Sequence, residues 1–324
     1  MSWYRRGSAS YDKKTYFDPL AIVLASSSVT VSSSARCMML FPSIHNVSLL
    51  FLGALIAVSH IRGVAGMYDI SLPLDPAGPL KVTLDYGLAT TWPWPQDVSL
   101  TTAKCNWQYS SHIVFANRVG DSDESDPPIS DGQLWQIARD AADEMTRERI
   151  RYGIRNGAEP VGMAALAWGN EIILASSMKG VGSFSYDFLV GDTPVGRSLQ
   201  QCQIVWRDNI SPGQNPNKLH KNKGNCAELL AAHLYYKNNR FDLQDQKARM
   251  GTWLNLADGW VKKDPCGTTE EDVWGCNLFT ANQGLRTLDT NTPSEPYTLA
   301  SLAGGPTIHE QIRLCGGQPR FFIG

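Results

Sequence analysis

The sequence predicts an α/β protein, and three patterns in its second half carry the prediction. Apolar residues recur at helical spacing over 131–151, after a serine that can cap a helix. Two apolar runs, 161–168 and 171–177, predict a β-hairpin because only a Gly-Asn pair separates them. A helix over 226–237 and a strand over 251–256 continue the alternation of helices and strands, which is typical of a helix-covered sheet.

The first part of the chain differs from the rest. Residues 1–37 include serine-rich, low-complexity sequence and are predicted to be a disordered extension. The 12-residue apolar run Val47–Val58 is too short to span a membrane, which takes about 20 residues. Its length suits the core of a signal peptide over 38–66, with small residues following it. We therefore expect a secreted protein, with a membrane anchor formed by the same segment as the alternative.

Charge bears on the expected partners. The whole chain has a formal net charge of −2. Residues 1–66 contain six basic and two acidic side chains, so their net charge is +4. The remaining residues therefore carry −6. An acidic mature protein of this kind argues against strong non-specific binding of nucleic acid. No membrane is expected as a partner of the mature form.

Residues 67–128 are expected to form an extended, strand-rich segment that ends in an acidic linker. Short alternating runs predict strands at 70–72, 80–84 and 112–115. The Trp-Pro-Trp-Pro run at 92–95 interrupts any regular element. The acidic, proline-ended run 121–128 predicts a boundary before a domain over 129–324.

The part of the chain between the hairpin and the helix at Cys226 is predicted to be an irregular insertion. Only a short strand over 203–206 is expected in it. A loop at 211–217 and a lysine-rich run over 218–223 follow. After Cys226 and the strand, a further helix is expected over 276–285.

Three cysteines and one glutamate are the strongest candidates for a metal-binding and catalytic site. Cys226 and Glu228 stand two residues apart, and Cys266 and Cys276 follow in the next part of the chain. A tetrahedral zinc ion with three protein ligands and one open position needs three such thiolates. A carboxylate close to one ligand can serve as general acid and base. Because Cys226 begins a helix, the helix dipole is expected to favour its thiolate.

This order of elements, with Cys-Ala-Glu at a helix start and Pro-Cys followed by a further Cys, resembles the zinc-dependent cytidine deaminase-like superfamily over residues 130–290. The resemblance implies a three-layer α/β/α core with a mixed sheet. It implies zinc as cofactor and Cys226, Cys266 and Cys276 as its ligands. The implied reaction is hydrolytic deamination of a nucleobase-type heterocycle, with zinc activating water and Glu228 moving the protons. The implied substrate is a small nucleobase-containing molecule or single-stranded nucleic acid.

Three further residues are predicted to contact the substrate: Asn225, Ala227 and Trp274. Asn225 can hydrogen-bond a base or ribose, and Trp274 can stack on a ring; capping the helix and packing in the core are their simpler roles. His220 can be a fourth ligand or a substrate contact, although a surface histidine in a lysine-rich loop is the simpler interpretation. For Glu228 the simpler interpretation is a solvent-facing helix carboxylate.

The same cysteines are also consistent with a different class of protein, one held together by disulfide bonds. Six cysteines follow residue 66, and an even number in an exported chain permits three disulfides. Nine residues separate Cys266 from Cys276, where the deaminase-like pattern has two, so a disulfide between these two is the main rival to zinc. The alternative function is therefore a secreted, disulfide-stapled interaction protein without catalytic activity.

Overall fold

The computed structural model describes residues 70–91, 105–121, 123–187, 192–209, 218–267 and 273–322. The disordered extension 1–37, the signal peptide 38–66, the run 92–95 and the loop 211–217 lie outside these residues and stay predictions, as does export. Among the described residues, no helix has both the length and the apolar character that crossing a bilayer requires.

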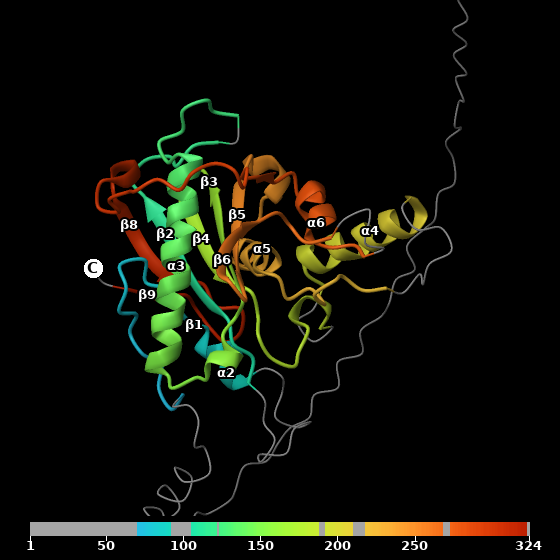
Figure 1. The fold of residues 1–324 in the computed structure, drawn as a ribbon, viewed down its shortest axis with the longest axis horizontal. Helices are drawn as coiled ribbons and strands as arrows, with labels where there is room; N and C mark the ends of the chain where they lie inside the picture. The colour runs from blue at the N-terminus through green and yellow to red at the C-terminus, as the bar shows by residue number, and fades with distance from the viewer. Residues whose placement is uncertain are drawn as a thin grey trace, which may run out of the picture. The chain divides into compact units, whose positions relative to one another are not determined.

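A nine-stranded sheet forms the centre of the described chain (Figure 1). Its strands are β1 (Thr83–Leu84), β2 (Tyr109–Phe115), β3 (Gly162–Trp168), β4 (Glu171–Ser176), β5 (Arg249–Leu256), β6 (Gly259–Lys263), β7 (Arg286–Thr287), β8 (Pro306–Gln311) and β9 (Arg320–Phe321). The order is β6-β5-β3-β4-β2-β8-β9, with β1 also paired to β2 and β7 to β5. Neighbouring strands are antiparallel except β5 and β7, so the expected mixed sheet is parallel only at that pair.

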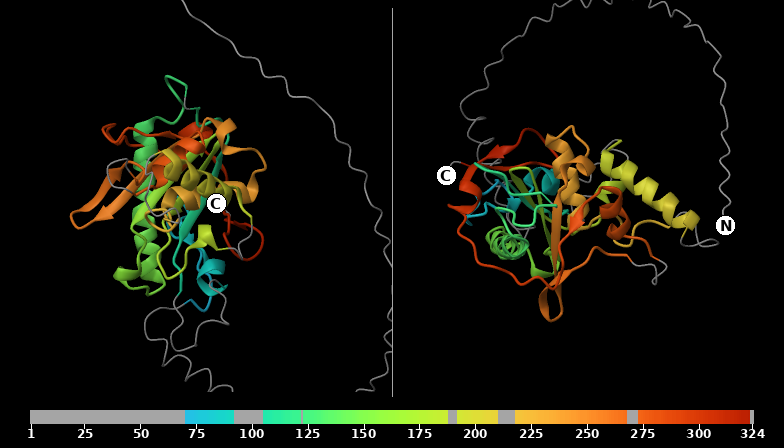
Figure 2. Two further views of the ribbon diagram at one scale, coloured as in Figure 1. Left: turned by 90° about the vertical axis from the view of Figure 1, so that its right-hand side faces the viewer. Right: turned by 90° about the horizontal axis from the view of Figure 1, so that it is seen from above.

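Helices cover both faces of this sheet. The described α-helices are α2 (Tyr86–Thr91), α3 (Asp131–Arg151), α4 (Pro194–Asn209), α5 (Ala227–Asn238) and α6 (Cys276–Asn282). Side chains alternate along β3: Ala165 and Ala167 pack in one hydrophobic cluster with α3, whereas Leu166 and Trp168 pack in a second cluster with α4, α5 and α6. Figure 2 accordingly shows α3 on one side of the sheet and α4 on the other.

The strongest local signals of the sequence are confirmed. Ser130 caps α3, and its hydroxyl accepts a hydrogen bond from the Gln133 N–H while the Gln133 side chain accepts from Ser130, which forms a capping box. Gly169 and Asn170 connect β3 to β4, whose first pair is Trp168 with Glu171. The strand over 251–256 lies within β5, and the helices expected from 226 and 276 are α5 and α6.

Two predicted strands are wrong. Residues 203–206 belong to α4, because Val195, Leu199, Cys202 and Trp206 recur at helical spacing and are buried together. Residues 70–72 form no strand; Leu72 is 71% exposed and no neighbouring strand pairs with it among the described residues. Of the run 80–84, only β1 is a strand. Helix α2 and strands β6, β7, β8 and β9 were not predicted.

Residues 67–128 and the domain expected over 129–324 share one sheet. β2 lies between β4 and β8, which come from the later part of the chain. The Glu144 carboxylate of α3 accepts hydrogen bonds from the backbone N–H groups of Leu80 (2.8 Å) and Val82 (3.1 Å). The early segment is therefore part of the same sheet as the later domain, and it packs with α3 on one face of that sheet.

Candidate metal centre and adjoining cavity

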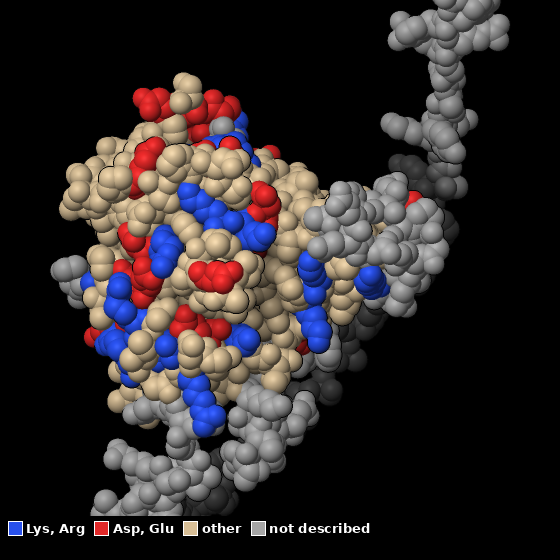
Figure 3. Space-filling view, in the orientation of Figure 1, with Lys and Arg blue, Asp and Glu red and all other residues tan. Residues whose placement is uncertain are grey.

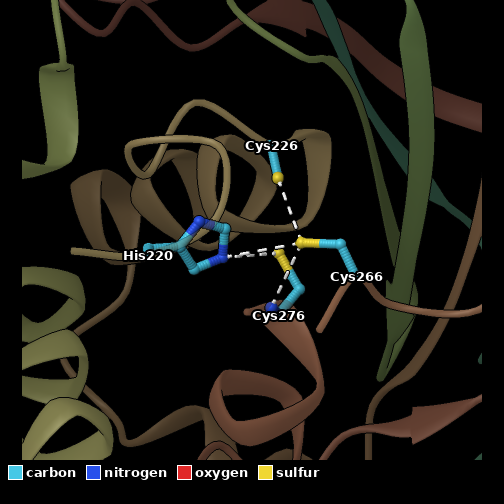
Figure 4. A group of neighbouring side chains, drawn as sticks. All are labelled: His220, Cys226, Cys266 and Cys276. Atoms are coloured by element: carbon cyan, nitrogen blue, oxygen red, sulfur yellow. Dashed lines mark hydrogen bonds between the residues drawn. The ribbon is translucent and has the colours of Figure 1, made fainter. Parts of the chain in front are cut away.

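Four side chains of the types that can ligate a metal converge in the structure: His220, Cys226, Cys266 and Cys276 (Figure 4). One ligand atom from each lies within 4.8 Å of all the others. Sγ of Cys266 lies 3.6 Å from Sγ of Cys226 and 3.7 Å from Nε2 of His220, and Sγ of Cys276 lies 3.3 Å from that nitrogen. Tetrahedral zinc, with bonds of about 2.3 Å to sulfur and about 2.0 Å to nitrogen, separates its ligands by about 3.5–3.8 Å. The donor set therefore fits zinc.

Helix α5 brings Cys226 to the cluster. Cys226 is the residue before the first turn, with extended φ and ψ of −68° and 153°, and its side chain does not cap the helix. Its sulfur instead accepts a hydrogen bond from Nδ2 of Asn222 at 3.1 Å. The start of the helix therefore directs this thiol toward the cluster, as the sequence predicted.

The two later cysteines meet across the ends of one loop. The Asn277 N–H donates to the Cys266 carbonyl at 3.0 Å, and the Cys276 N–H donates to Sγ of Cys266 at 3.4 Å. Gly275 permits this approach, because a Cβ atom there would lie 2.3 Å from the Cys266 carbonyl oxygen. The nine-residue separation thus still brings Cys276 to the other thiols.

The disulfides of the alternative function are absent among the cysteines that the structure describes. All six cysteines that the structure describes are free thiols. Cys266 and Cys276, the pair named as the main rival to zinc, are therefore not bonded to each other. The Cys226 and Cys266 sulfur atoms, 3.6 Å apart, are also well beyond the disulfide bond length of about 2.05 Å. The packing of the chain segments that carry them holds the three thiols together without a covalent bond.

His220 is buried, which corrects the surface interpretation. It is 2% exposed, and its backbone N–H donates to the Tyr186 hydroxyl at 3.1 Å. Trp274 packs edge-on against its ring, with ring centroids 5.4 Å apart, and donates from Nε1 to the Lys218 carbonyl at 2.7 Å. Trp274 is 1% exposed and does not line the cavity, so it braces His220 in place of the predicted substrate contact.

The thiols and the nearby carboxylate do not titrate alike. Hydrogen bonds from Cys226 and Cys276 lower the pKa of Cys266. The hydrogen bond to Cys266 raises the pKa of Cys226, and burial raises the pKa of Cys276. The thiolate that the helix dipole was expected to favour at Cys226 is thus favoured at Cys266. A divalent cation would favour the charged form of all three sulfurs.

Glu228 lies beside the cluster and not in solvent. Its side chain projects from the first turn of α5 and is 5% exposed, so the solvent-facing interpretation is wrong. Oε2 of Glu228 lies 3.7 Å from Sγ of Cys276. Burial, with the nearby charge of Cys266, raises the pKa of Glu228, while a hydrogen bond with Thr252 opposes the rise. A raised pKa suits a carboxylate that must gain and lose a proton.

A cavity of about 790 Å³ adjoins the cluster. Glu228, Cys226 and Cys266 line it, whereas His220 and Cys276 do not. Much of its wall is apolar and includes Val161, Met178, Leu254 and Leu256. Cavities of this size accommodate small molecules. The cavity therefore joins a buried carboxylate, two sulfurs of the candidate metal cluster and room for a ligand.

Two of the predicted substrate contacts lie on this cavity. Asn225 donates from Nδ2 to the Gly182 carbonyl at 2.8 Å, and its buried Oδ1 accepts no hydrogen bond from the described residues. Ala227 lines the cavity with its neighbour. Asn222 and Thr252 were not predicted; Asn222 lies in the lysine-rich run and Thr252 in the predicted strand, where neither residue type signals a site.

No family model, curated protein or solved structure matches this chain.

Proposed function

We propose that this protein is a zinc-dependent hydrolase of the cytidine deaminase-like class, which replaces the exocyclic amine of a nucleobase-type heterocycle with oxygen. The observation that carries the proposal is the position of Glu228. It is buried, lies 3.7 Å from a metal-ligating thiol and lines the same cavity as Cys226 and Cys266. A structural metal site needs no such carboxylate and no such cavity.

The arrangement of helices and strands supports the same class. Helix α3 lies on one face of the sheet, and α5, which carries Cys226 and Glu228, lies on the other. The β3–β4 hairpin and β5 lie between them. We therefore propose the three-layer α/β/α deaminase-like core for residues 130–290, with the early strands β1 and β2 and the late strands β8 and β9 added at one side.

Glu228 would move the protons of the reaction. Bound zinc would supply a Lewis acid that lowers the pKa of water to about 7. Glu228 would take a proton from the attacking water and pass it to the ring nitrogen next to the amine-bearing carbon. It would then take the second proton and give it to the leaving amine. The carbon–nitrogen bond breaks as the carbonyl forms, and ammonia leaves.

The cavity favours a small substrate over a long polynucleotide. Its volume of about 790 Å³ lies within the range of small-molecule sites. Acidic and basic side chains are interspersed on the face of the molecule in Figure 3, which has no broad basic surface for a polynucleotide backbone. Three lysines line the cavity, Lys221, Lys223 and Lys263, so a phosphate on the substrate is compatible with the site.

The proposal is tested by zinc analysis and ammonia release on the purified full chain. Cytosine, adenine and guanine are offered as free bases, nucleosides and nucleotides, together with single-stranded oligonucleotides. One zinc per chain and ammonia from at least one small substrate are expected. A chain that binds zinc but releases ammonia from none of them contradicts the enzymatic proposal, and a chain without zinc contradicts the metal centre itself.

A further inference from the structure

The His220 ring faces its own loop with one nitrogen and the thiols with the other (Figure 4). The backbone N–H groups of Asn222 and Gly224 donate to Nδ1 at 3.1 Å and 3.4 Å. A backbone N–H can only donate, so Nδ1 accepts and carries no hydrogen. A neutral imidazole has one N–H, which therefore sits on Nε2.

Nε2 is the nitrogen that approaches the sulfur atoms. It lies 3.3 Å from Sγ of Cys276 and 3.7 Å from Sγ of Cys266. A ring nitrogen that bears hydrogen has no lone pair to offer a metal. We infer that His220 is a positioning residue that donates a hydrogen bond to the thiolate of Cys276, and is not a fourth metal ligand. This inference rests on the proposed zinc centre.

Each of the three sulfurs then has an N–H donor of its own. Asn222 Nδ2 donates to Cys226 at 3.1 Å, the Cys276 N–H donates to Cys266 at 3.4 Å, and His220 Nε2 donates to Cys276. Three thiolates and one divalent cation carry a net charge of −1, and N–H donors spread that charge. The three-thiolate set therefore does not need the imidazole as a ligand to be satisfied.

The loop backbone fixes the ring in this orientation. Lys223 and Gly224 both have left-handed conformations, with φ of 52° and 71°, and these turn the Gly224 N–H back toward Nδ1. Trp274 packs edge-on against the ring, and Tyr186 accepts the His220 backbone N–H. Reversing the ring would place carbon atoms against the two backbone donors and the sulfurs, so the surroundings favour one orientation.

The consequence is a zinc ion with one coordination position left for water. Four protein ligands would close the site and suit a structural ion, whereas three leave the position that catalysis requires. Of the four convergent side chains, the two that line the cavity are Cys226 and Cys266, on the side of Glu228. Whether His220 is a ligand therefore distinguishes a structural zinc site with four protein ligands from a catalytic site with three.

X-ray absorption spectroscopy at the zinc edge of the full chain tests the inference. The expected spectrum has three sulfur neighbours and one light atom, without the multiple-scattering signature of imidazole. Nitrogen-15 NMR of histidine-labelled protein is expected to show His220 with hydrogen on Nε2 and none on Nδ1. Imidazole scattering, or hydrogen on Nδ1, overturns the inference while leaving zinc binding intact. A chain without zinc overturns both the inference and the proposed function.

Variants give a second readout. His220→Gln is expected to keep the three-sulfur environment and to weaken zinc binding about 10- to 100-fold, as the loss of an outer hydrogen bond does. His233→Gln is the matched control, because His233 is also buried but bonds to the Ser185 hydroxyl at 3.0 Å. The wild-type absorption spectrum could instead show a nitrogen neighbour of zinc. If that neighbour is lost in His220→Gln but kept in His233→Gln, His220 is a ligand and the inference is wrong.

Discussion

Glu228 Oε2 lies 3.7 Å from Sγ of Cys276, and both side chains are buried. Among the described residues, Glu228 forms no ion pair with a lysine or arginine. Two acidic groups are therefore held side by side away from water, an arrangement that disfavours their charged forms unless a cation lies nearby. The relationship links the carboxylate to the metal centre and underlies the first two predictions.

Glu228→Gln is expected to keep zinc and to lose about 10²- to 10⁴-fold in the rate of ammonia release, the usual contribution of a general acid and base. The amide preserves the shape of the side chain and its contact with Thr252 but cannot carry the proton. Zinc content and initial rates measured on the same preparation separate the two effects. A variant with full activity would exclude Glu228 as the proton carrier.

Cys276→Ser is expected to reduce bound zinc well below one ion per chain and to lower Tm. Free zinc at about 100 times its Kd stabilises a folded chain by about 2.7 kcal/mol, and the variant forfeits much of this. Cys202→Ser is the matched control, since Cys202 is equally buried and burial raises its pKa to about 11, but it lies outside the cluster. Equal zinc loss in both variants would argue against a specific site.

Gly275→Ala is expected to cost about 1–3 kcal/mol of stability and to weaken zinc binding. The added Cβ would lie 2.3 Å from the Cys266 carbonyl oxygen, so Cys266 and the start of α6 must separate. Gly157→Ala is the control, because nothing lies within 4 Å of a Cβ there. Urea unfolding and zinc titration of both variants provide the measurement, and an unchanged Gly275→Ala protein would contradict the close approach.

The folded protein is expected to lose stability at alkaline pH because of the two carboxylates around His112. Nε2 of the His112 ring lies 2.7 Å from Oε2 of Glu171, and Nδ1 lies 2.8 Å from Oε1 of Glu310. These two contacts join β2, which carries His112, to β4 and β8. Burial lowers the pKa of His112, but the two carboxylates outweigh it and raise the pKa above 6.5. A raised histidine pKa means that the stabilisation is complete below about pH 6.5 and is lost as pH rises through the folded value.

Urea unfolding at about pH 5.5 and about pH 8.5 measures this effect, and His112→Gln isolates it. The variant is expected to lose up to about 3 kcal/mol at the lower pH, because it leaves buried carboxylate charge uncompensated. Its stability should then fall less between the two pH values than that of the wild type. Asp85, whose pKa burial raises to about 6, acts in the same direction, so only the difference between the two proteins reports His112. Parallel pH profiles would refute the assignment.

Local sequence patterns predicted the elements whose stability is local. The Ser130 cap, the apolar spacing that follows it and the Gly169-Asn170 turn each specify a conformation within a few residues. The same approach was wrong for residues 203–206, where a short apolar run suits either a strand or one side of a helix. Burial of Trp206 against the second cluster, a tertiary effect, decided the helix.

The sequence by itself determined the chemical inventory of the site: three thiols and a carboxylate two residues from the first. Only the tertiary structure decided that they meet, since Cys226 and Cys266 lie 40 positions apart in the chain and His220 and Cys276 lie 56 positions apart. The tertiary structure also shows that Trp274 does not line the cavity and that His220 is buried in the cluster and not exposed on the surface. The physical reason is that caps, turns and periodicity act between neighbours in the chain. The convergence of ligands depends on how distant loops pack against a common sheet.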